Sequence, residues 1–161
     1  MKKPGKKNLK EPITSEKESL EARPIGMDEV NRGLSPNIDK CDLLLVESVE
    51  FQPFITMLIR RSMPDMKIEL ASDGLEASIK VGELRPRIVW TELRLPRMSG
   101  FELIELIRQN PNLKNTKIIV STAYGSEDVR SRALEMGVFR FLRKPYKIEE
   151  ALSAIADCLL E

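Results

Sequence analysis

Histidine is absent from this chain of 161 residues, and cysteine occurs only twice. Without histidine the chain has no Ser-His-Asp triad, no histidine-ligated zinc site and no phosphohistidine carrier. The two cysteines, Cys41 and Cys158, do not form a Cys-x-x-Cys pair, and two thiols alone do not complete a structural zinc site. These absences remove histidine-based catalysis and structural zinc binding from the functions to be considered.

Long hydrophobic runs are lacking as well. The longest is Leu43–Val46, whereas a membrane-spanning helix needs about 20 apolar residues. The Lys-rich N-terminus has no apolar core segment, so it is not a secretory signal. With 26 Lys+Arg against 25 Asp+Glu, the net charge of +1 gives no general reason to expect binding to nucleic acid or to an anionic membrane. We therefore expect a reduced, cytoplasmic protein.

The first part of the chain differs in composition from the rest. Its first ten residues hold five lysines and no acid, prolines recur at positions 4, 12, 24 and 36, and the apolar residues show no periodic face. This pattern predicts a flexible extension over residues 1–41, followed by a single domain over residues 42–161. Two interpretations of the extension remain open, a solvated leader or an arm that binds a partner or a membrane surface.

From position 42 onward, strand and helix patterns alternate five times. Continuous apolar segments at 43–46, 88–90 and 118–120 predict strands buried on both faces, and alternating segments at 67–70 and 138–142 predict edge strands. Repeated strand–helix units imply right-handed crossovers and a parallel sheet. We therefore expect an α/β fold in which a five-stranded parallel sheet, in the flavodoxin-like order 2-1-3-4-5, has helices on both faces.

Two helix starts and several packing relations are also predicted. Asp73 with Glu76 and Ser99 with Glu102 have the spacing of a capping box. After the first strand, the apolar residues with helical spacing are Phe54, Met57 and Leu58. We expect Cys41 and Cys158 to lie near each other on one face of the sheet, without a disulfide in a reduced compartment.

Polar residues follow four of the predicted strands. Glu47 and Ser48 come after the first strand, Glu92 after the third, Thr122 after the fourth and Lys144 after the fifth. Ligands of open parallel sheets bind outside the carboxyl ends of the strands. These five residues are therefore the candidates for a functional site.

The same strand ends, with the loops between them, closely resemble the receiver domain of bacterial response regulators over residues 42–161. The resemblance implies that a partner kinase transfers a phosphoryl group from histidine to an aspartate after the third strand. It also implies a magnesium ion, a hydroxyl and a lysine that bind the phosphoryl oxygens, and an aromatic side chain on the fifth strand that turns inward. The segments that carry the resemblance are Leu43–Ser48, Ala71–Ala77, Glu92–Gly100, Thr122-Ala123, Gly137 and Lys144–Tyr146.

The phosphoacceptor and metal positions depart from the family pattern. Glu92 stands in place of the acceptor aspartate, and Glu47-Ser48 stand in place of an acidic pair. The extra methylene of Glu92 displaces its carboxylate from the geometry of in-line attack and carries it toward Thr122 and Lys144. We expect Glu92 to be a fixed partner of these two residues that imitates the phosphorylated state only in part; a true phosphoacceptor is the alternative.

The metal site follows from the same substitutions. Glu47 is either a weak magnesium ligand together with Glu92 or a structural acid paired with Lys144. The backbone carbonyl that the family uses as a ligand belongs here to Arg94. Ser48 is expected to be a helix N-cap, which needs no ligand.

The remaining positions keep the family's residue types. Lys144 is the candidate that binds a phosphoryl group or a carboxylate. Thr122 either donates to Glu92 or is a plain hydroxyl at a strand end, and Phe141 is either a switch residue or part of the core. A basic stretch beside the fifth strand is either a docking surface or a solvated edge; it comprises Arg140, Arg143 and Lys147.

The resemblance and its departures together predict a single-domain atypical response regulator. We expect it to act by protein–protein interaction, without enzymatic activity and without phosphorylation, because the chain ends with the fifth helix. The expected partners are a histidine kinase or a signalling assembly, or a second copy of the chain in a homodimer. The alternatives are a magnesium-dependent phosphoacceptor and a pseudo-receiver with a structural or ligand-binding role.

Overall fold

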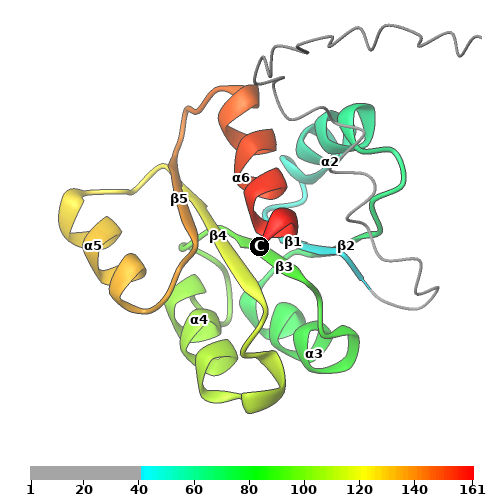
Figure 1. Ribbon diagram of the computed structural model, residues 1–161. Helices are drawn as coiled ribbons and strands as arrows, with labels where there is room; N and C mark the ends of the chain where they lie inside the picture. The colour runs from blue at the N-terminus through cyan, green and yellow to red at the C-terminus, as the bar shows by residue number, and fades with distance from the viewer. Residues whose placement is uncertain (1–40) are drawn as a thin grey trace, which may run out of the picture.

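The computed structural model describes residues 41–161, and apart from Cys41 the predicted N-terminal extension lies outside these residues. Five parallel strands form one sheet in the order β2-β1-β3-β4-β5, which confirms the predicted topology (Figure 1). The strands are β1 (Leu43–Val46), β2 (Ile68–Ala71), β3 (Ile88–Thr91), β4 (Lys117–Thr122) and β5 (Arg140–Arg143).

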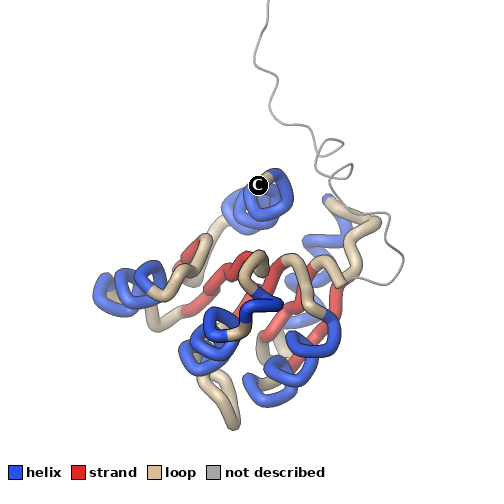
Figure 2. Tube along the Cα trace, turned by 60° about the horizontal axis from the view of Figure 1, so that its bottom comes forward, coloured by secondary structure: helices blue, strands red, loops and turns tan. Residues whose placement is uncertain are grey.

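Helices cover both faces of this sheet, as Figure 2 shows when the molecule is turned. Side chains of α2 and α6 pack on one face, and those of α3, α4 and α5 pack on the other. The helices are α2 (Gln52–Ser62), α3 (Gly74–Leu84), α4 (Gly100–Gln109), α5 (Glu127–Glu135) and α6 (Ile148–Leu160), with a short 3₁₀ turn η1 (Pro111–Leu113) before β4. Within residues 41–161, no helix is long and apolar enough to cross a membrane.

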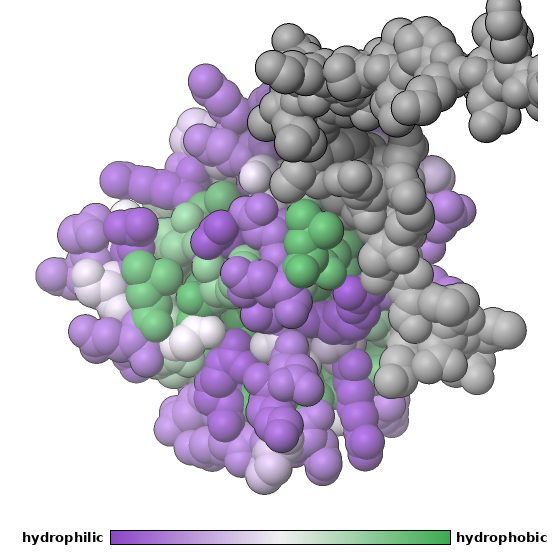
Figure 3. Space-filling model, viewed as in Figure 1, coloured by the Kyte–Doolittle hydropathy of each residue, from purple (hydrophilic) through white to green (hydrophobic). Residues whose placement is uncertain are grey.

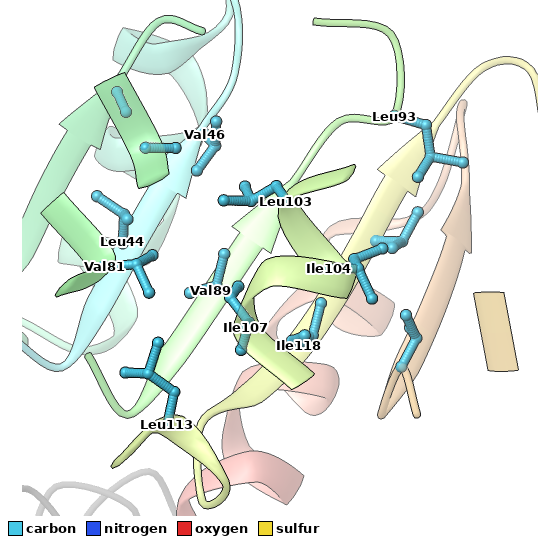
Figure 4. Close-up of a cluster of buried hydrophobic side chains, with 14 of the residues drawn as sticks. Leu44, Val46, Val81, Val89, Leu93, Leu103, Ile104, Ile107, Leu113 and Ile118 are labelled. Carbon is cyan, nitrogen blue, oxygen red and sulfur yellow. The ribbon is translucent and has the colours of Figure 1, made fainter. Parts of the chain in front are cut away.

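The central strands are buried on both faces because each alternates between two hydrophobic cores. In β1, Leu44 and Val46 face α3 and α4, whereas Leu43 and Leu45 face α2 and α6. Figure 4 shows the first of these cores, in which strand side chains meet those of α4. Outside the cores, hydrophilic residues cover most of the face seen in Figure 3.

The two edge strands, β2 and β5, are shifted along the sequence from their predicted positions. β2 begins and ends one residue later than expected, and β5 begins at Arg140 instead of position 138. Gly137 turns the chain after α5 with a φ of +85°, which only glycine adopts without strain. Val138 then fills the core, and its N–H donates to the carbonyl of Ala133 (3.1 Å). Val138 therefore still belongs to the turn that follows α5.

The predicted capping residues Asp73 and Ser99 are the N-caps of α3 and α4. Asp73 accepts a hydrogen bond from the N–H of Glu76 (2.9 Å), while the Glu76 carboxylate accepts from Ser72 and not from Asp73. Ser99 and Glu102 form a complete capping box. The cap at Asp73 is thus one half of the predicted arrangement, and the cap at Ser99 is confirmed in full.

The apolar residues noted at helical spacing, Phe54, Met57 and Leu58, do not form the buried face of α2, and Leu58 is only half-buried. Phe54 and Met57 are exposed, and the buried residues are Gln52, Ile55 and Ile59. The Gln52 side chain donates to the carbonyls of Glu47 (2.7 Å) and Ala71 (3.0 Å), and these bonds fix which side of the helix faces the sheet. The sequence spacing alone did not reveal this polar anchor.

Two further expectations are corrected. Ser48 is not the N-cap of α2, because the helix begins at Gln52 with Phe51 at the cap position and no side-chain cap. Cys41 and Cys158 lie in different cores on opposite faces of the sheet. The chain before Leu43 is not yet a strand, so the alternation of β1 does not extend to Cys41. Both thiols are free, and burial raises their pKa values to about 11 and about 12.

Candidate functional site

The sheet brings the predicted site residues to its carboxyl edge. The N–H of Glu92 donates to the carbonyl of Val46 (3.0 Å), so the β1–β3 pairing continues past the last residue of β3. In the same way, the N–H of Lys144 donates to the carbonyl of Thr122 (2.8 Å). Because parallel pairing continues to these positions, side chains distant in the sequence converge there.

Glu47, Glu92 and Lys144 form one charged cluster, called here the carboxylate–lysine cluster. The Lys144 ammonium lies 2.6 Å from Glu47 Oε2 and 3.2 Å from Glu92 Oε2. The exposed fractions of the side chains are 3% for Glu47, 11% for Glu92 and 21% for Lys144, so water screens these contacts little. Burial lowers the pKa of Lys144, but the hydrogen bond and charge of Glu47 and the charge of Glu92 outweigh it, so the pKa is raised.

Every oxygen of the two carboxylates has a donor. Besides the lysine ammonium, Glu47 Oε1 accepts from the N–H of Ser48 (3.0 Å). Glu92 Oε1 accepts from the N–H groups of Leu93 (2.6 Å) and Arg94 (3.3 Å). The cluster is therefore satisfied by the chain's own groups, and Ser48 contributes its backbone while its side chain lies at an exposed position.

Thr122 and Phe141 lie beside this cluster and are not hydrogen-bonded within it. Thr122 is fully buried, and its Oγ1 accepts from the N–H of Tyr124 (3.2 Å); within residues 41–161 no hydrogen bond joins it to Glu92. Phe141 is half-buried and packs against the core under α4 and α5. A Cβ atom on Gly125 would lie 2.8 Å from Phe141 Cε1, so any other residue there would require the Phe141 ring to shift.

Two aromatic residues at the mouth of the site, Tyr124 and Phe51, were not predicted from the sequence. The guanidinium carbon of Arg94 lies 3.3 Å from the ring centroid of Tyr124, and the Lys144 ammonium lies 5.2 Å from that of Phe51. Both rings are about half exposed, at 54% for Tyr124 and 52% for Phe51. Cations over aromatic faces are attracted by the ring quadrupole. The only sequence signal was position, since Tyr124 follows Thr122 by two residues.

The loop after β3 is attached to the start of α3. The N–H of Gly74 donates to the carbonyl of Pro96 (3.3 Å), and the Arg97 guanidinium binds the Asp73 carboxylate. The hydrogen bond from Arg97 lowers the pKa of Asp73. A Cβ on Gly74 would lie 1.9 Å from the carbonyl oxygen of Met98, so only glycine permits this approach. The loop that carries the backbone donors of Glu92 is thus held in place.

A family model for the response regulator receiver domain matches residues 45–156. The chain belongs to this family. It is a receiver domain of two-component signalling, in which receivers interact with histidine kinases and other proteins. The sequence resemblance to the receiver domain is therefore confirmed.

Three comparisons place this receiver domain among known proteins. Hybrid signal transduction histidine kinase D of Dictyostelium discoideum is 28% identical over 117 residues, which cover 73% of this chain and 7% of the kinase. A protein-glutamate methylesterase/protein-glutamine glutaminase of Myxococcus xanthus is 34% identical over 108 residues, or 66% of this chain and 30% of the enzyme. The receiver domain of a sensor histidine kinase from Pseudomonas aeruginosa has a TM-score of 0.67 at 25% identity and covers 76% of this chain and 99% of that one. The chain thus spans less than a third of both sequence relatives.

The Pseudomonas receiver holds a magnesium ion in its active site cleft. In the present chain, the residues of the carboxylate–lysine cluster do not fit a magnesium ion. Magnesium takes free oxygen ligands in near-octahedral geometry, but here the Lys144 ammonium lies between the two carboxylates, and backbone N–H groups bind their remaining oxygens. Ser48, which follows Glu47, has a hydroxyl and supplies no further carboxylate. Among residues 41–161, no group of three Asp, Glu, His or Cys side chains is arranged to hold a metal.

Proposed function

We propose that this receiver domain signals through protein–protein contact without phosphorylation of Glu92. The observation that supports the proposal is the carboxylate–lysine cluster, in which Glu92 Oε2 binds Lys144 and Glu92 Oε1 binds backbone N–H groups. In-line attack requires a free carboxylate oxygen about 3–3.5 Å from phosphorus. Attack by Glu92 would first have to break the contacts that neutralise its charge.

Charge and geometry favour a receiver fixed in one state. A phosphoryl group brings a charge of about −2 and three acceptor oxygens, whereas a glutamate brings −1 and two. Glu92 already binds the lysine that would bind a phosphoryl group, but it forms no hydrogen bond with Thr122. We infer that Glu92 replaces only the lysine half of the phosphoryl contacts, and that Thr122 and Phe141 do not switch.

The partner class follows from the family. We propose a histidine kinase or a larger signalling assembly in the cytoplasm as the partner, with a homodimer as the alternative, and no enzymatic reaction at this site. We expect Glu92 to affect partner binding indirectly, because its charge is part of the carboxylate–lysine cluster. Partner affinity should therefore change when Glu92 is replaced by Gln, which keeps the shape of the side chain and removes its charge.

The first test uses Trp90, the chain's only tryptophan, which is fully buried and contacts Tyr146 edge to face with 5.9 Å between ring centroids. Trp90 lies two residues before Glu92, so its fluorescence reports changes at the site. We would titrate magnesium and then beryllofluoride, a phosphoryl mimic. We expect no saturable response from the wild-type protein.

The matched control is the double variant S48D/E92D, which restores both aspartates of the family pattern. We expect this variant to respond to magnesium and then again to beryllofluoride. A saturable response of the wild-type protein at millimolar magnesium would refute the proposal and establish the magnesium-dependent phosphoacceptor instead. A response of the double variant alone would show that the two substitutions are what disables the site.

A further inference from the structure

A basic cavity of about 1010 Å³ lies at the N-terminal edge of the sheet, opposite the carboxylate–lysine cluster. It is formed where α3 and α4 end and where β3 and β4 begin, and the end of α6 closes one side. Glu161 is the one acidic residue that lines it within residues 41–161. Its cationic lining residues are Arg85, Arg87, Arg108, Lys114 and Lys117.

The positive charge of this cavity is only partly compensated. Lys117 pairs with Glu161 (3.2 Å), and Arg87 lies 3.7 Å from the Asp42 carboxylate. Arg85, Arg108 and Lys114 form no ion pair with any carboxylate of residues 41–161. Three uncompensated cations therefore border one cavity.

An anion in the cavity would be stabilised most beside the guanidinium of Arg108. Its terminal nitrogens donate to the carbonyls of Thr116 (3.1 Å) and Gly137 (2.9 Å), which hold the guanidinium in place. Its Nε is buried and has no acceptor within the described part of the chain. A partly desolvated cation without a counter-ion is costly, and a carboxylate beside it removes that cost.

The chain enters the domain at the same edge. The carbonyl of Cys41, the first described residue, accepts a hydrogen bond from the N–H of Arg87 (3.3 Å). The sequence before it contains an acidic stretch over residues 11–29, whose six acids and two bases give a net charge of 2 − 6 = −4. The acids are Glu11, Glu16, Glu18, Glu21, Asp28 and Glu29.

The connecting residues are long enough for this stretch to reach the cavity. Residues 30–40 span up to about 35 Å when extended, whereas a domain of this size has a radius of gyration of about 14 Å. Attachment through a short linker also gives an effective concentration in the millimolar range. Even a weak electrostatic contact is therefore well populated within one chain.

We propose that the acidic stretch at residues 11–29 binds in the basic cavity of its own chain. The stretch supplies the carboxylates that Arg85, Arg108 and Lys114 lack, at the edge where the chain enters β1. This contact is independent of Glu92 and goes beyond the function proposed above. It gives the receiver a second interaction surface that its own sequence occupies.

The test is carbodiimide coupling of the full chain, which joins a lysine amine to a carboxylate in contact with it. The cross-linked peptides are then identified by mass spectrometry. We expect Lys114 to couple to acids of residues 11–29, and Lys117 to couple to Glu161 as an internal control for folding and chemistry. The Lys114 products should fall about tenfold near 1 M salt, where the Debye length is about 3 Å.

A matched pair of variants separates specific docking from general attraction. Arg85→Glu reverses a charge at the cavity and keeps Lys114, so its Lys114 products should fall severalfold while the Lys117–Glu161 product stays. Arg60→Glu reverses an exposed charge on α2 and should leave both unchanged. The proposal is overturned if Lys114 does not couple to residues 11–29, which leaves the cavity to another acidic partner. Equal yields from both variants, or coupling between isotopically labelled and unlabelled copies, would overturn it as well.

Discussion

Lys144 is the residue on which the electrostatics of the site depend. Its ammonium is the shared counter-ion of two carboxylates whose side chains are 3% and 11% exposed. The sequence predicted this pairing from the positions of three strand ends. It could not predict that backbone N–H groups satisfy the remaining carboxylate oxygens, because those bonds depend on the paths of the loops after β1 and β3.

Replacing Lys144 with Met should destabilise the fold by about 3 kcal/mol, because removing one partner leaves buried carboxylates without a counter-ion. The measurement is urea unfolding at neutral pH. Lys117→Met is the control, since Glu161 is 64% exposed and such pairs contribute about 1 kcal/mol or less. Equal losses of unfolding free energy in the two variants would show that the carboxylate–lysine cluster stabilises the fold no more than an exposed ion pair does.

The raised pKa of Lys144 also predicts a pH dependence. The folded state holds this proton more tightly than the unfolded chain, so the stabilisation is complete below 10.5, the ordinary pKa of lysine, and is lost as pH rises through the raised value. We expect the free energy of unfolding of the wild-type protein to fall more steeply above pH 10.5 than that of K144M. The control is Lys147→Met at an exposed position, which should leave the dependence of the unfolding free energy on pH as in the wild type. Parallel pH curves for the wild type and K144M would contradict the raised pKa of Lys144.

At the scale of elements, hydrophobic patterning predicted the strands well because three of them are apolar on both faces. The hydrophobic pattern did not indicate the buried side of a helix where a polar side chain determines the orientation of that helix. Phe54 and Met57 have helical spacing but are exposed, and the hydrogen bonds of Gln52 place Ile55 and Ile59 on the buried side of α2 instead. The contact of Arg94 with the Tyr124 ring could not be predicted from the sequence either, because the two residues lie in loops that follow different strands.

Helix α3 contains a matched pair of glycines with opposite expectations. Gly74→Ala should destabilise the protein by about 2 kcal/mol or more, since the new Cβ would lie 1.9 Å from a backbone oxygen of the loop after β3. Gly82→Ala should stabilise it by about 0.5–1 kcal/mol, because nothing lies within 4 Å and alanine favours the helix. Thermal unfolding of both variants measures the difference; a loss of stability in Gly82→Ala would contradict the packing described.

At the scale of the whole molecule, the two cores lie on opposite faces of one sheet and each contains a buried thiol. We expect Cys41 and Cys158 to react with iodoacetamide only as fast as the protein unfolds, because burial limits access and raises both pKa values. Alkylation followed by mass spectrometry, with and without urea, measures this. Rapid modification of the native protein, or a disulfide between the two residues under mild oxidation, would be inconsistent with their separation.

The carboxylate–lysine cluster also bears on what would happen if the two aspartates of the family pattern were introduced one at a time. Ser48→Asp alone would add a third carboxylate beside two that share a single ammonium, and Glu92→Asp alone would draw its carboxylate away from Lys144. Each single step therefore carries an electrostatic cost before the second step brings any benefit. No single-nucleotide change converts a serine codon into an aspartate codon, so the first of these steps requires two changes within one codon. The contact of one lysine with carboxylates from two strand ends therefore opposes either substitution made by itself.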